Sequence, residues 1–149
     1  MRKTILIGGG PIPLTAIVLA QKYGVPSVVL DSDAEAINLS EKIIAGLGLQ
    51  RQITCIHSSG ENCKVYHEYS LIFVATLAGI DSEDKQRIFA AIKSQSAPDT
   101  YILTRSSHGA KKLLYLPIDQ AIQGQFETVI DIHPDDDVMN SIILLKTAT

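Results

Sequence analysis

A glycine-rich segment near the start of the chain has the composition of a ligand-binding loop. Gly8, Gly9 and Gly10 follow a short apolar run, and two prolines, Pro11 and Pro13, come soon after them. Glycines in such a loop let the backbone approach a ligand closely. The third glycine of the dinucleotide fingerprint would fall at Pro13, and the Lys-Ser/Thr pair of a phosphate loop is missing. The loop therefore favours a nucleoside without phosphates, with a plain strand-to-helix turn as the alternative.

Two polar residues, Asp31 and Ser32, follow the second apolar run. A carboxylate at this place can accept hydrogen bonds from both ribose hydroxyls. The alternative role of Asp31 is to cap the next helix, although Asp33 could hold that role instead. The spacing of Ser32 and Glu35 also fits a capping box, in which the serine begins the helix and the glutamate reaches back. We expect Asp31 to bind ribose, with Ser32 beside it in the same cofactor site.

Small side chains follow the third and fourth apolar runs. After the third run, Ser58 lies in a His-Ser-Ser-Gly-Glu stretch, where small polar groups could contact an adenine edge and Glu61 could supply an acidic group. After the fourth run, Thr76, Leu77 and Ala78 could line an apolar pocket around a nucleoside or a thioether. Plain packing is an equally good interpretation of this second stretch.

The fifth apolar run is followed by an arginine and a histidine close together. Arg105 suits a substrate carboxylate, which a guanidinium can hold through two parallel hydrogen bonds. His108 could serve as a base, since an imidazole titrates near neutral pH. The alternatives are that Ser106 or Ser107 caps the next helix and that His108 is structural. No two histidines stand four residues apart, so the sequence predicts no metal site.

The apolar runs alternate with amphipathic segments along the chain. The runs predict strands at residues 4–7, 27–30, 53–56, 71–75 and 101–104. Apolar runs without alternation are typical of parallel strands that are buried on both faces. The amphipathic segments predict helices at residues 13–23, 33–47, 81–93 and 108–115. Ligands of such folds bind beyond the carboxyl ends of the strands, where all the residues discussed above would lie.

The end of the chain has a different pattern. Two strand-like runs at residues 126–132 and 139–145 are joined by a His-Pro-Asp-Asp-Asp turn without a helix between them. They predict a hairpin that closes the sheet with an antiparallel edge strand. The whole pattern predicts an α/β domain with an open, mostly parallel sheet and a C-terminal antiparallel hairpin. This is the layout of the class I Rossmann fold of the methyltransferases that use S-adenosylmethionine (SAM).

Composition excludes several classes of protein. The 149 residues form one domain, residues 1–149, with 13 basic and 16 acidic residues and a net charge of −3. Without a basic excess, nucleic acid is not an expected partner. No apolar run reaches the ~20 residues that span a bilayer, so a membrane is not expected either. Two cysteines are too few for a disulfide scaffold, which favours a reducing cytoplasm.

Five motifs together resemble the nicotianamine synthase family over nearly the whole chain. The first is Gly-Gly-Gly-Pro-Ile-Pro-Leu-Thr at residues 8–15, and the second is Asp-Ser-Asp at residues 31–33. The third is the small-residue stretch at residues 75–81. The fourth is Arg-Ser-Ser-His-Gly-Ala at residues 105–110, and the fifth runs from His-Pro to Val-Met-Asn-Ser at residues 133–141. The sequence is similar to bacterial opine-metallophore synthases as well.

The resemblance implies SAM as a substrate and an unusual bond cleavage. Members of this family direct an amine to the aminobutyrate carbon of SAM, not to its methyl group, and release methylthioadenosine. Their products are nicotianamine-like or opine-like metallophores, and the protein itself needs no metal. The acceptor would be a small amine or amino acid, which must be deprotonated and in line with the carbon that it attacks.

The resemblance also leaves alternatives. Members of the family carry a helical domain before the Rossmann domain, whereas Met1 here stands almost on the first strand. The chain could be a fragment, a stand-alone relative, a homodimer or half of a pair with a helical partner. One alternative is a SAM-dependent small-molecule methyltransferase, although Leu6 stands where such enzymes usually carry an acidic residue. Another is a SAM-binding module without activity.

Overall fold

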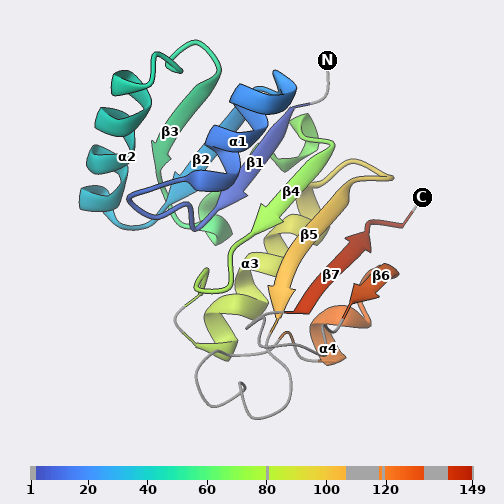
Figure 1. Ribbon diagram of the computed structural model, residues 1–149. Helices are drawn as coiled ribbons and strands as arrows, with labels where there is room; N and C mark the ends of the chain where they lie inside the picture. Colours follow the sequence, from blue (N-terminus) through green and yellow to red (C-terminus); the bar gives the residue numbers. More distant parts are fainter. Residues whose placement is uncertain (1–2, 80, 107–117, 119, 133–140, 149) are drawn as a thin grey trace.

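The structure of the chain is a computed structural model that describes residues 3–79, 81–106, 118, 120–132 and 141–148. Within these residues, seven strands form one sheet in the order β3-β2-β1-β4-β5-β7-β6 (Figure 1). The strands are β1 (Thr4–Ile7), β2 (Ser27–Asp31), β3 (Ile53–His57), β4 (Leu71–Val74), β5 (Tyr101–Ser106), β6 (Glu127–Ile132) and β7 (Ser141–Lys146). Strands β1 to β5 are parallel, as the continuous apolar runs predict.

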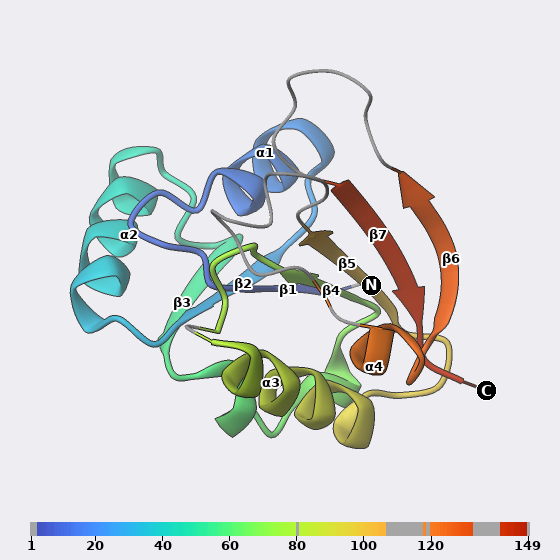
Figure 2. The same cartoon turned by 90° about the horizontal axis from the view of Figure 1, so that it is seen from below.

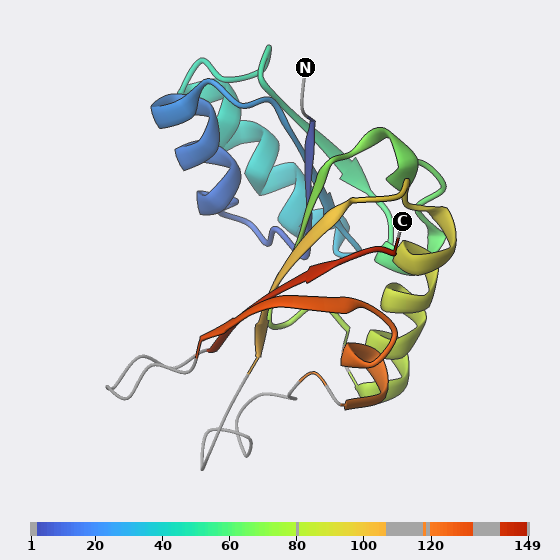
Figure 3. The same cartoon turned by 90° about the vertical axis from the view of Figure 1, so that its right-hand side faces the viewer.

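The helices cover both faces of this sheet. They are α1 (Leu14–Tyr23), α2 (Ala34–Gly46), α3 (Ser82–Gln95) and α4 (Gln120–Gln123), with 3-10 turns η1 (Gly60–Asn62) and η2 (Tyr66–Glu68). In Figure 2, α1 and α2 lie on one face, and α3 and α4 lie on the other. Figure 3 shows the same two layers with the sheet between them. Helical connections between parallel strands explain this arrangement.

Strand β1 shows why the strands read as continuous apolar runs. Ile5 and Ile7 belong to the core cluster on the α3 face, where they pack with Phe89 and other apolar side chains. Leu6 points to the opposite face and packs in a second cluster that includes Ile17 of α1. Because successive side chains alternate between two buried faces, every residue of the strand must be apolar or satisfied.

The start of α2 differs from one sequence-based expectation. Asp33 is the N-cap residue, and its Oδ1 accepts hydrogen bonds from the backbone amides of Glu35 at 2.8 Å and Ala36 at 3.4 Å. The capping box on Ser32 is therefore wrong. Both residues have cap-forming side chains, and a carboxylate also gains from the positive end of the helix dipole. With Asp33 as the cap, Asp31 is not needed for this role.

The C-terminal strands form the antiparallel pair that the sequence predicts, and the structure adds their order in the sheet. Strand β7 lies between β5 and β6 and is antiparallel to both, so β6 forms the edge of the sheet and runs parallel to β5. Burial explains this order. Strand β7 buries Ile143 and Leu145 in the core, whereas every residue of β6 is exposed. The helix expected at residues 108–115 lies outside the described residues.

Candidate functional site

A cavity of about 450 Å³ lies at the carboxyl ends of the central strands. From the centre of the sheet, the chain adds strands outward from β1 to β3 on one side and from β4 to β5 on the other. The order of the strands therefore reverses between β1 and β4. Ligands of open α/β sheets bind at such a switch point. The predicted site residues in the lining are Gly8, Gly10, Pro11, Asp31, Ser32, Ser58, Leu77 and Ala78.

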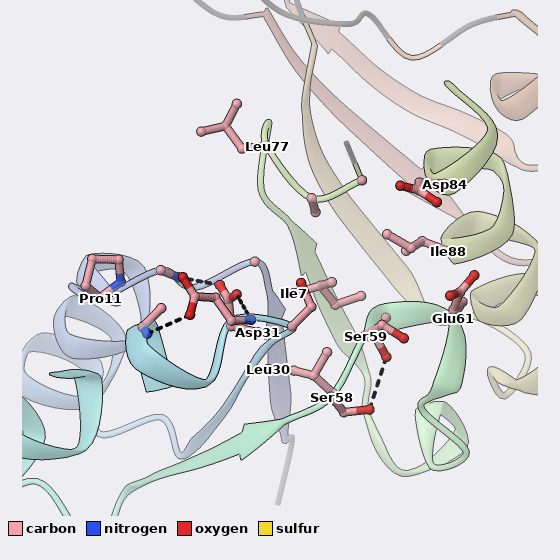
Figure 4. A pocket seen from close by; sticks show the side chains of 18 residues that line it. Ile7, Pro11, Leu30, Asp31, Ser58, Ser59, Glu61, Leu77, Asp84 and Ile88 are labelled. Atoms are coloured by element: carbon pink, nitrogen blue, oxygen red, sulfur yellow. Dashed lines mark hydrogen bonds between the residues drawn. The ribbon is translucent and has the colours of Figure 1, made fainter. Parts of the chain in front are cut away.

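Two walls face each other across this cavity (Figure 4). We call the first the β2 wall, which consists of Gly8, Gly10, Pro11, Asp31 and Ser32. We call the second the α3 wall, which consists of Ser59, Gly60, Glu61, Asp84 and Ile88. The loop that follows β4 reaches the cavity from above in this view, with Leu77 at its tip.

Gly8 makes the turn that brings the loop after β1 close to the loop after β4. Its φ of +76° lies in the left-handed region, which side chains disfavour. A Cβ atom on Gly8 would stand 3.1 Å from the Cβ of Ala78 and 3.3 Å from the Cβ of Ala75. Two features of this position thus favour glycine, namely its backbone conformation and its close contact with the loop after β4.

The carboxylate of Asp31 fixes the glycine loop. Its Oδ2 accepts a hydrogen bond from the amide of Gly10 at 2.8 Å, and its Oδ1 accepts one from the amide of Asp33 at 2.9 Å. On the other side of Gly10, the fully buried hydroxyl of Ser40 in α2 donates to the Gly10 carbonyl at 2.7 Å. Two carboxylate oxygens offer about four acceptor positions, so Asp31 keeps capacity for ribose hydroxyls.

The α3 wall is fixed at Gly60. The buried Tyr66 hydroxyl donates to the Gly60 carbonyl at 2.6 Å, and burial raises the pKa of this phenol. A Cβ on Gly60 would stand 2.9 Å from Cγ2 of Ile7 and 3.1 Å from Cγ2 of Ile88. The turn η1 therefore packs directly between β1 and α3. The neighbouring Ser59 hydroxyl is buried and has no hydrogen-bond partner in the described part of the chain.

Arg87 connects two acidic residues of the α3 wall. Its Nε donates to Glu61 at 2.8 Å, and its Nη2 contacts the carboxylate of Asp84. Glu83 of the same helix is a third partner at 3.2 Å. The Arg87 side chain is 47% exposed, so solvent and salt screen these ion pairs.

Acidic side chains lie on both sides of the cavity, with Asp31 and Asp33 on one side and Glu61 and Asp84 on the other. Among the described lining residues there is no lysine or arginine. Arg87, behind the α3 wall, pairs with Glu61 and Asp84, whereas no ion pair of Asp31 or Asp33 is seen in the described part of the chain. The side of the cavity at Asp31 and Asp33 therefore attracts positive charge.

Comparison with known proteins decides the family. A family model described as nicotianamine synthase protein matches residues 1–149. The chain belongs to the nicotianamine synthase family. Nicotianamine synthase 2 of Arabidopsis thaliana is 32% identical over 97% of this chain and 46% of its own length. The nicotianamine synthase of Solanum lycopersicum is 30% identical over 97% of this chain and 47% of its own length. The chain thus spans about half the length of these relatives.

Solved structures confirm the predicted fold class. A crystal structure of a mutant of MtNAS in complex with S-adenosylmethionine aligns with a TM-score of 0.86 at 28% identity. This alignment covers 99% of the present chain and 55% of the MtNAS chain. The methyltransferase SibL aligns with a TM-score of 0.78 at 16% identity, over 99% of this chain and 51% of its own. At that identity, the second match shows the fold alone.

Three described residues that were predicted for the site do not line the cavity, and a fourth predicted residue is not described. A Cβ on Gly9 would stand 2.3 Å from Val29, so this glycine lets the loop pack on β2 beneath α1. Thr76 precedes Leu77 in the loop after β4 but is not part of the lining. Arg105 is exposed near the end of β5, opposite Ile142. His108 lies outside the described residues.

Sequence reasoning missed several residues of the site. The additional residues that line the cavity or fix its walls are Ser40, Ser59, Gly60, Asp84, Arg87 and Ile88. Most of them lie inside helices, and the sequence pattern of a helix does not show which of its polar residues face a cavity and which face solvent. Only Gly60 gave a local signal, since a glycine in a strand-to-helix connection often marks a close backbone approach.

Within the described residues, no group of three histidine, cysteine or acidic side chains could hold a metal ion. No helix in that part of the chain is long and apolar enough to cross a bilayer.

Burial and the nearby Glu41 raise the pKa of the Cys55 thiol to about 11. A protonated thiol is a poor nucleophile.

Proposed function

We propose that the cavity binds SAM and that the chain is the SAM-binding part of an aminobutyrate-transferring synthase. The observation that carries the proposal is the cavity at the switch point of a chain that aligns with SAM-bound MtNAS over 99% of its length. MtNAS has also been crystallised in complex with MTA and tNA. MTA, methylthioadenosine, is what remains of SAM when its aminobutyrate group leaves.

The two walls would share the parts of SAM between them. On the β2 wall, Asp31 would accept hydrogen bonds from the ribose hydroxyls, while Gly8, Gly10, Pro11 and Ser32 would hold the backbone close to the nucleoside. The neighbouring Gly9 would support this loop from beneath. The acidic lining would favour the sulfonium of SAM over a neutral nucleoside.

The opposite side would enclose the base. Ser58 and the unpartnered hydroxyl of Ser59 would meet the adenine edge, where a ligand group could satisfy the Ser59 hydrogen bond. Thr76, Leu77 and Ala78 would form the apolar part of the pocket. Leu77 is 75% exposed, and a bound nucleoside would cover part of this side chain.

The reaction would replace a carbon–sulfur bond of SAM by a carbon–nitrogen bond to the acceptor. The amine nitrogen of the acceptor attacks the aminobutyrate carbon next to sulfur, and the carbon–sulfur bond breaks. Its electron pair moves to sulfur, so the sulfonium becomes the neutral thioether of methylthioadenosine, and the amine loses one proton. We assign the proton acceptance to His108 and the binding of the acceptor carboxylate to Arg105.

A further segment would complete this site. Apolar side chains that closely follow the cavity-lining Pro11 in the chain are strongly exposed, with Ile12 at 62% and Leu14 at 64%. The curated relatives have about as much additional chain as they share with this one. We propose that a helical segment of that kind, in the same or a partner chain, covers the opening and excludes water from the transfer.

A product assay tests the proposed function. The 149-residue chain is incubated with SAM and a pool of amino acids and small amines, and products are identified by mass spectrometry. Where product forms, methylthioadenosine with an aminobutyrate-extended amine is expected. S-adenosylhomocysteine with a methylated product would instead establish a methyltransferase and contradict the proposal. SAM binding without any product would show that this chain is the SAM-binding part alone and that the transfer needs the further segment proposed above.

The same assay tests whether Arg105 binds the amine acceptor or SAM. Arg105→Ala is expected to leave the affinity for SAM unchanged and to raise the KM for the amine acceptor. The control is Arg51→Ala, an exposed arginine away from the cavity lining. A loss of SAM affinity in the Arg105 variant would move this arginine to the cofactor side of the site.

A further inference from the structure

A lysine is buried directly behind the loop that follows β4. Lys85 is the fourth residue of α3 and is only 2% exposed. Its Nζ donates a hydrogen bond to the backbone carbonyl of Thr76 at 3.1 Å. Burial lowers the pKa of this ammonium, as desolvation disfavours the charged form.

The location of this ammonium is doubly unfavourable. A buried cation loses its hydration, which costs several kcal/mol unless partners replace the water. The first turns of a helix also carry the positive end of its dipole, which repels a cation. Glu83 and Asp84 in the first turn, together with the Asp81 cap, offset part of that repulsion. An apolar residue of similar length would avoid both costs, so packing alone does not account for a lysine here.

The hydrogen bond from Lys85 to Thr76 shows one group that the ammonium holds in place. The Thr76 carbonyl lies near the start of the turn at residues 75–79, whose first amide, Ala75 N, donates to the Ile7 carbonyl at 3.0 Å. At the other end of the turn, Gly79 lies against the backbone of Lys85, since a Cβ on Gly79 would stand 2.9 Å from Lys85 N. Lys85 therefore contacts the turn at both ends.

This turn carries the residues that meet the glycine loop. The amide of Ala78 donates to the Ala75 carbonyl at 3.0 Å, and the Ala78 side chain stands against Gly8. A shift of the Thr76 carbonyl would move Leu77 and Ala78 with it, because the turn is only five residues long. Both residues line the cavity, whereas Lys85 does not.

We propose that Lys85 is a positioning residue for SAM, which acts by holding the Thr76 carbonyl and so fixing Leu77 and Ala78 against the bound nucleoside. The inference rests on the proposed SAM site and extends it to a residue outside the cavity lining. Lys85 itself touches neither SAM nor the acceptor. Its effect is on the affinity for SAM and on the order of one turn.

The test replaces the ammonium by a neutral chain of similar length. Lys85→Met is compared with the wild-type chain and with Lys93→Met, the same change at an exposed position of α3. SAM affinity is measured by calorimetry, and backbone amide exchange is measured by mass spectrometry without ligand. We expect the Kd for SAM to rise about ten-fold in Lys85→Met and to stay unchanged in Lys93→Met. Faster exchange is expected at residues 75–79 and not in β1 or β2.

A second variant keeps the test valid if Lys85→Met does not fold. Lys85→Gln retains a neutral N–H donor on a shorter chain, and its Kd for SAM should lie between those of the wild type and the methionine variant. Wild-type affinity in either Lys85 variant would overturn the proposal. Faster amide exchange throughout the sheet, together with weaker SAM binding, would overturn it too, since Lys85 would then stabilise the whole domain and not one turn. Failure of the wild-type chain to bind SAM would instead refute the proposed function.

Discussion

The two walls of the cavity are fixed in different ways. On the β2 wall, hydrogen bonds hold both backbone groups of Gly10, with Asp31 at its amide and the fully buried Ser40 at its carbonyl. On the α3 wall, Gly60 has one buried anchor in Tyr66, but the link from η1 to the first turn of α3 runs through Arg87, which is 47% exposed. The β2 wall is thus held by hydrogen bonds that are partly shielded from water. The other depends in part on ion pairs that solvent screens.

The two walls should therefore respond differently to salt. The proposed ribose site needs fixed acceptors, because each hydroxyl is recognised by the position of a single oxygen. On the α3 wall, the packing of Gly60 against Ile88 holds η1 on α3, and the screened ion pairs of Arg87 add to this contact. The contribution of Arg87 should fall as the salt concentration rises, whereas that of Ser40 should not.

The carboxylate of Asp31 should have the largest effect on ligand binding. Asp31→Ala removes the ribose acceptor and the anchor of the Gly10 amide together, and SAM affinity should fall by about 1–3 kcal/mol. Asp31→Asn, which keeps one acceptor oxygen, should lose less. Calorimetric titration of both variants with SAM is the measurement, and unchanged affinity in Asp31→Ala would remove the assignment of ribose binding to the β2 wall.

Ser40 should have the next largest effect, and stability is its readout. Ser40→Ala leaves the Gly10 carbonyl without its donor, so the free energy of unfolding without ligand should fall by about 1–2 kcal/mol. Ser59→Ala is the matched control, since it removes a buried hydroxyl that has no partner in the described structure. Denaturant unfolding measures both variants. An equal loss in the two would mean that the Ser40 hydrogen bond does not stabilise the β2 wall.

Arg87 should have a smaller effect that depends on salt. In Arg87→Met, the links from Glu61 and Asp84 to the guanidinium are lost, and the melting temperature should fall slightly at low ionic strength. The difference from the wild type should shrink in 1 M salt, where the Debye length is about 3 Å. Ser40→Ala should show no such salt dependence. A salt-independent loss in the arginine variant would mean that both walls are fixed in the same way.

The smallest effect expected is the coupling between the two walls. Ser40 and Arg87 share no partner and lie on opposite sides of the cavity, so their effects on stability should add in the double variant. Ser40 and Asp31 both bind Gly10, so their effects should not add. Thermal unfolding of the single and double variants measures both cycles. Additivity in the second pair would show that Gly10 is not held as one unit.

Residues that directly follow a strand could be found from sequence. The glycine loop and Asp31 come immediately after apolar runs, and the topology of a parallel sheet brings such positions to one edge. The parallel part of the sheet could be predicted as well, because continuous apolar runs are typical of strands that are buried on both faces. The family resemblance rested on these same segments together with residues 105–110 and 133–141.

The remaining features depend on contacts between residues that are far apart in the sequence, and no local pattern shows these contacts. Ser40, Lys85 and Arg87 stand inside helices, and their contacts with Gly10, Thr76 and Glu61 span 30, 9 and 26 residues of the chain. The place of β7 between β5 and β6 follows from which strand buries more apolar surface, not from chain order. At the start of α2, Ser32 and Asp33 both have cap-forming side chains, and the sequence alone does not show which of them the backbone places at the cap.

The most direct test of the central claim, that SAM binds between the two walls, is a map of where SAM perturbs the backbone. Nitrogen-15-labelled chain is titrated with SAM, and amide chemical shifts are followed by NMR. The account predicts the largest shifts at Gly8, Gly10, Ser59 and Ala78, with none on the exposed edge strand β6. Shifts confined to β6, or to any surface away from the carboxyl ends of β1 and β4, would contradict it.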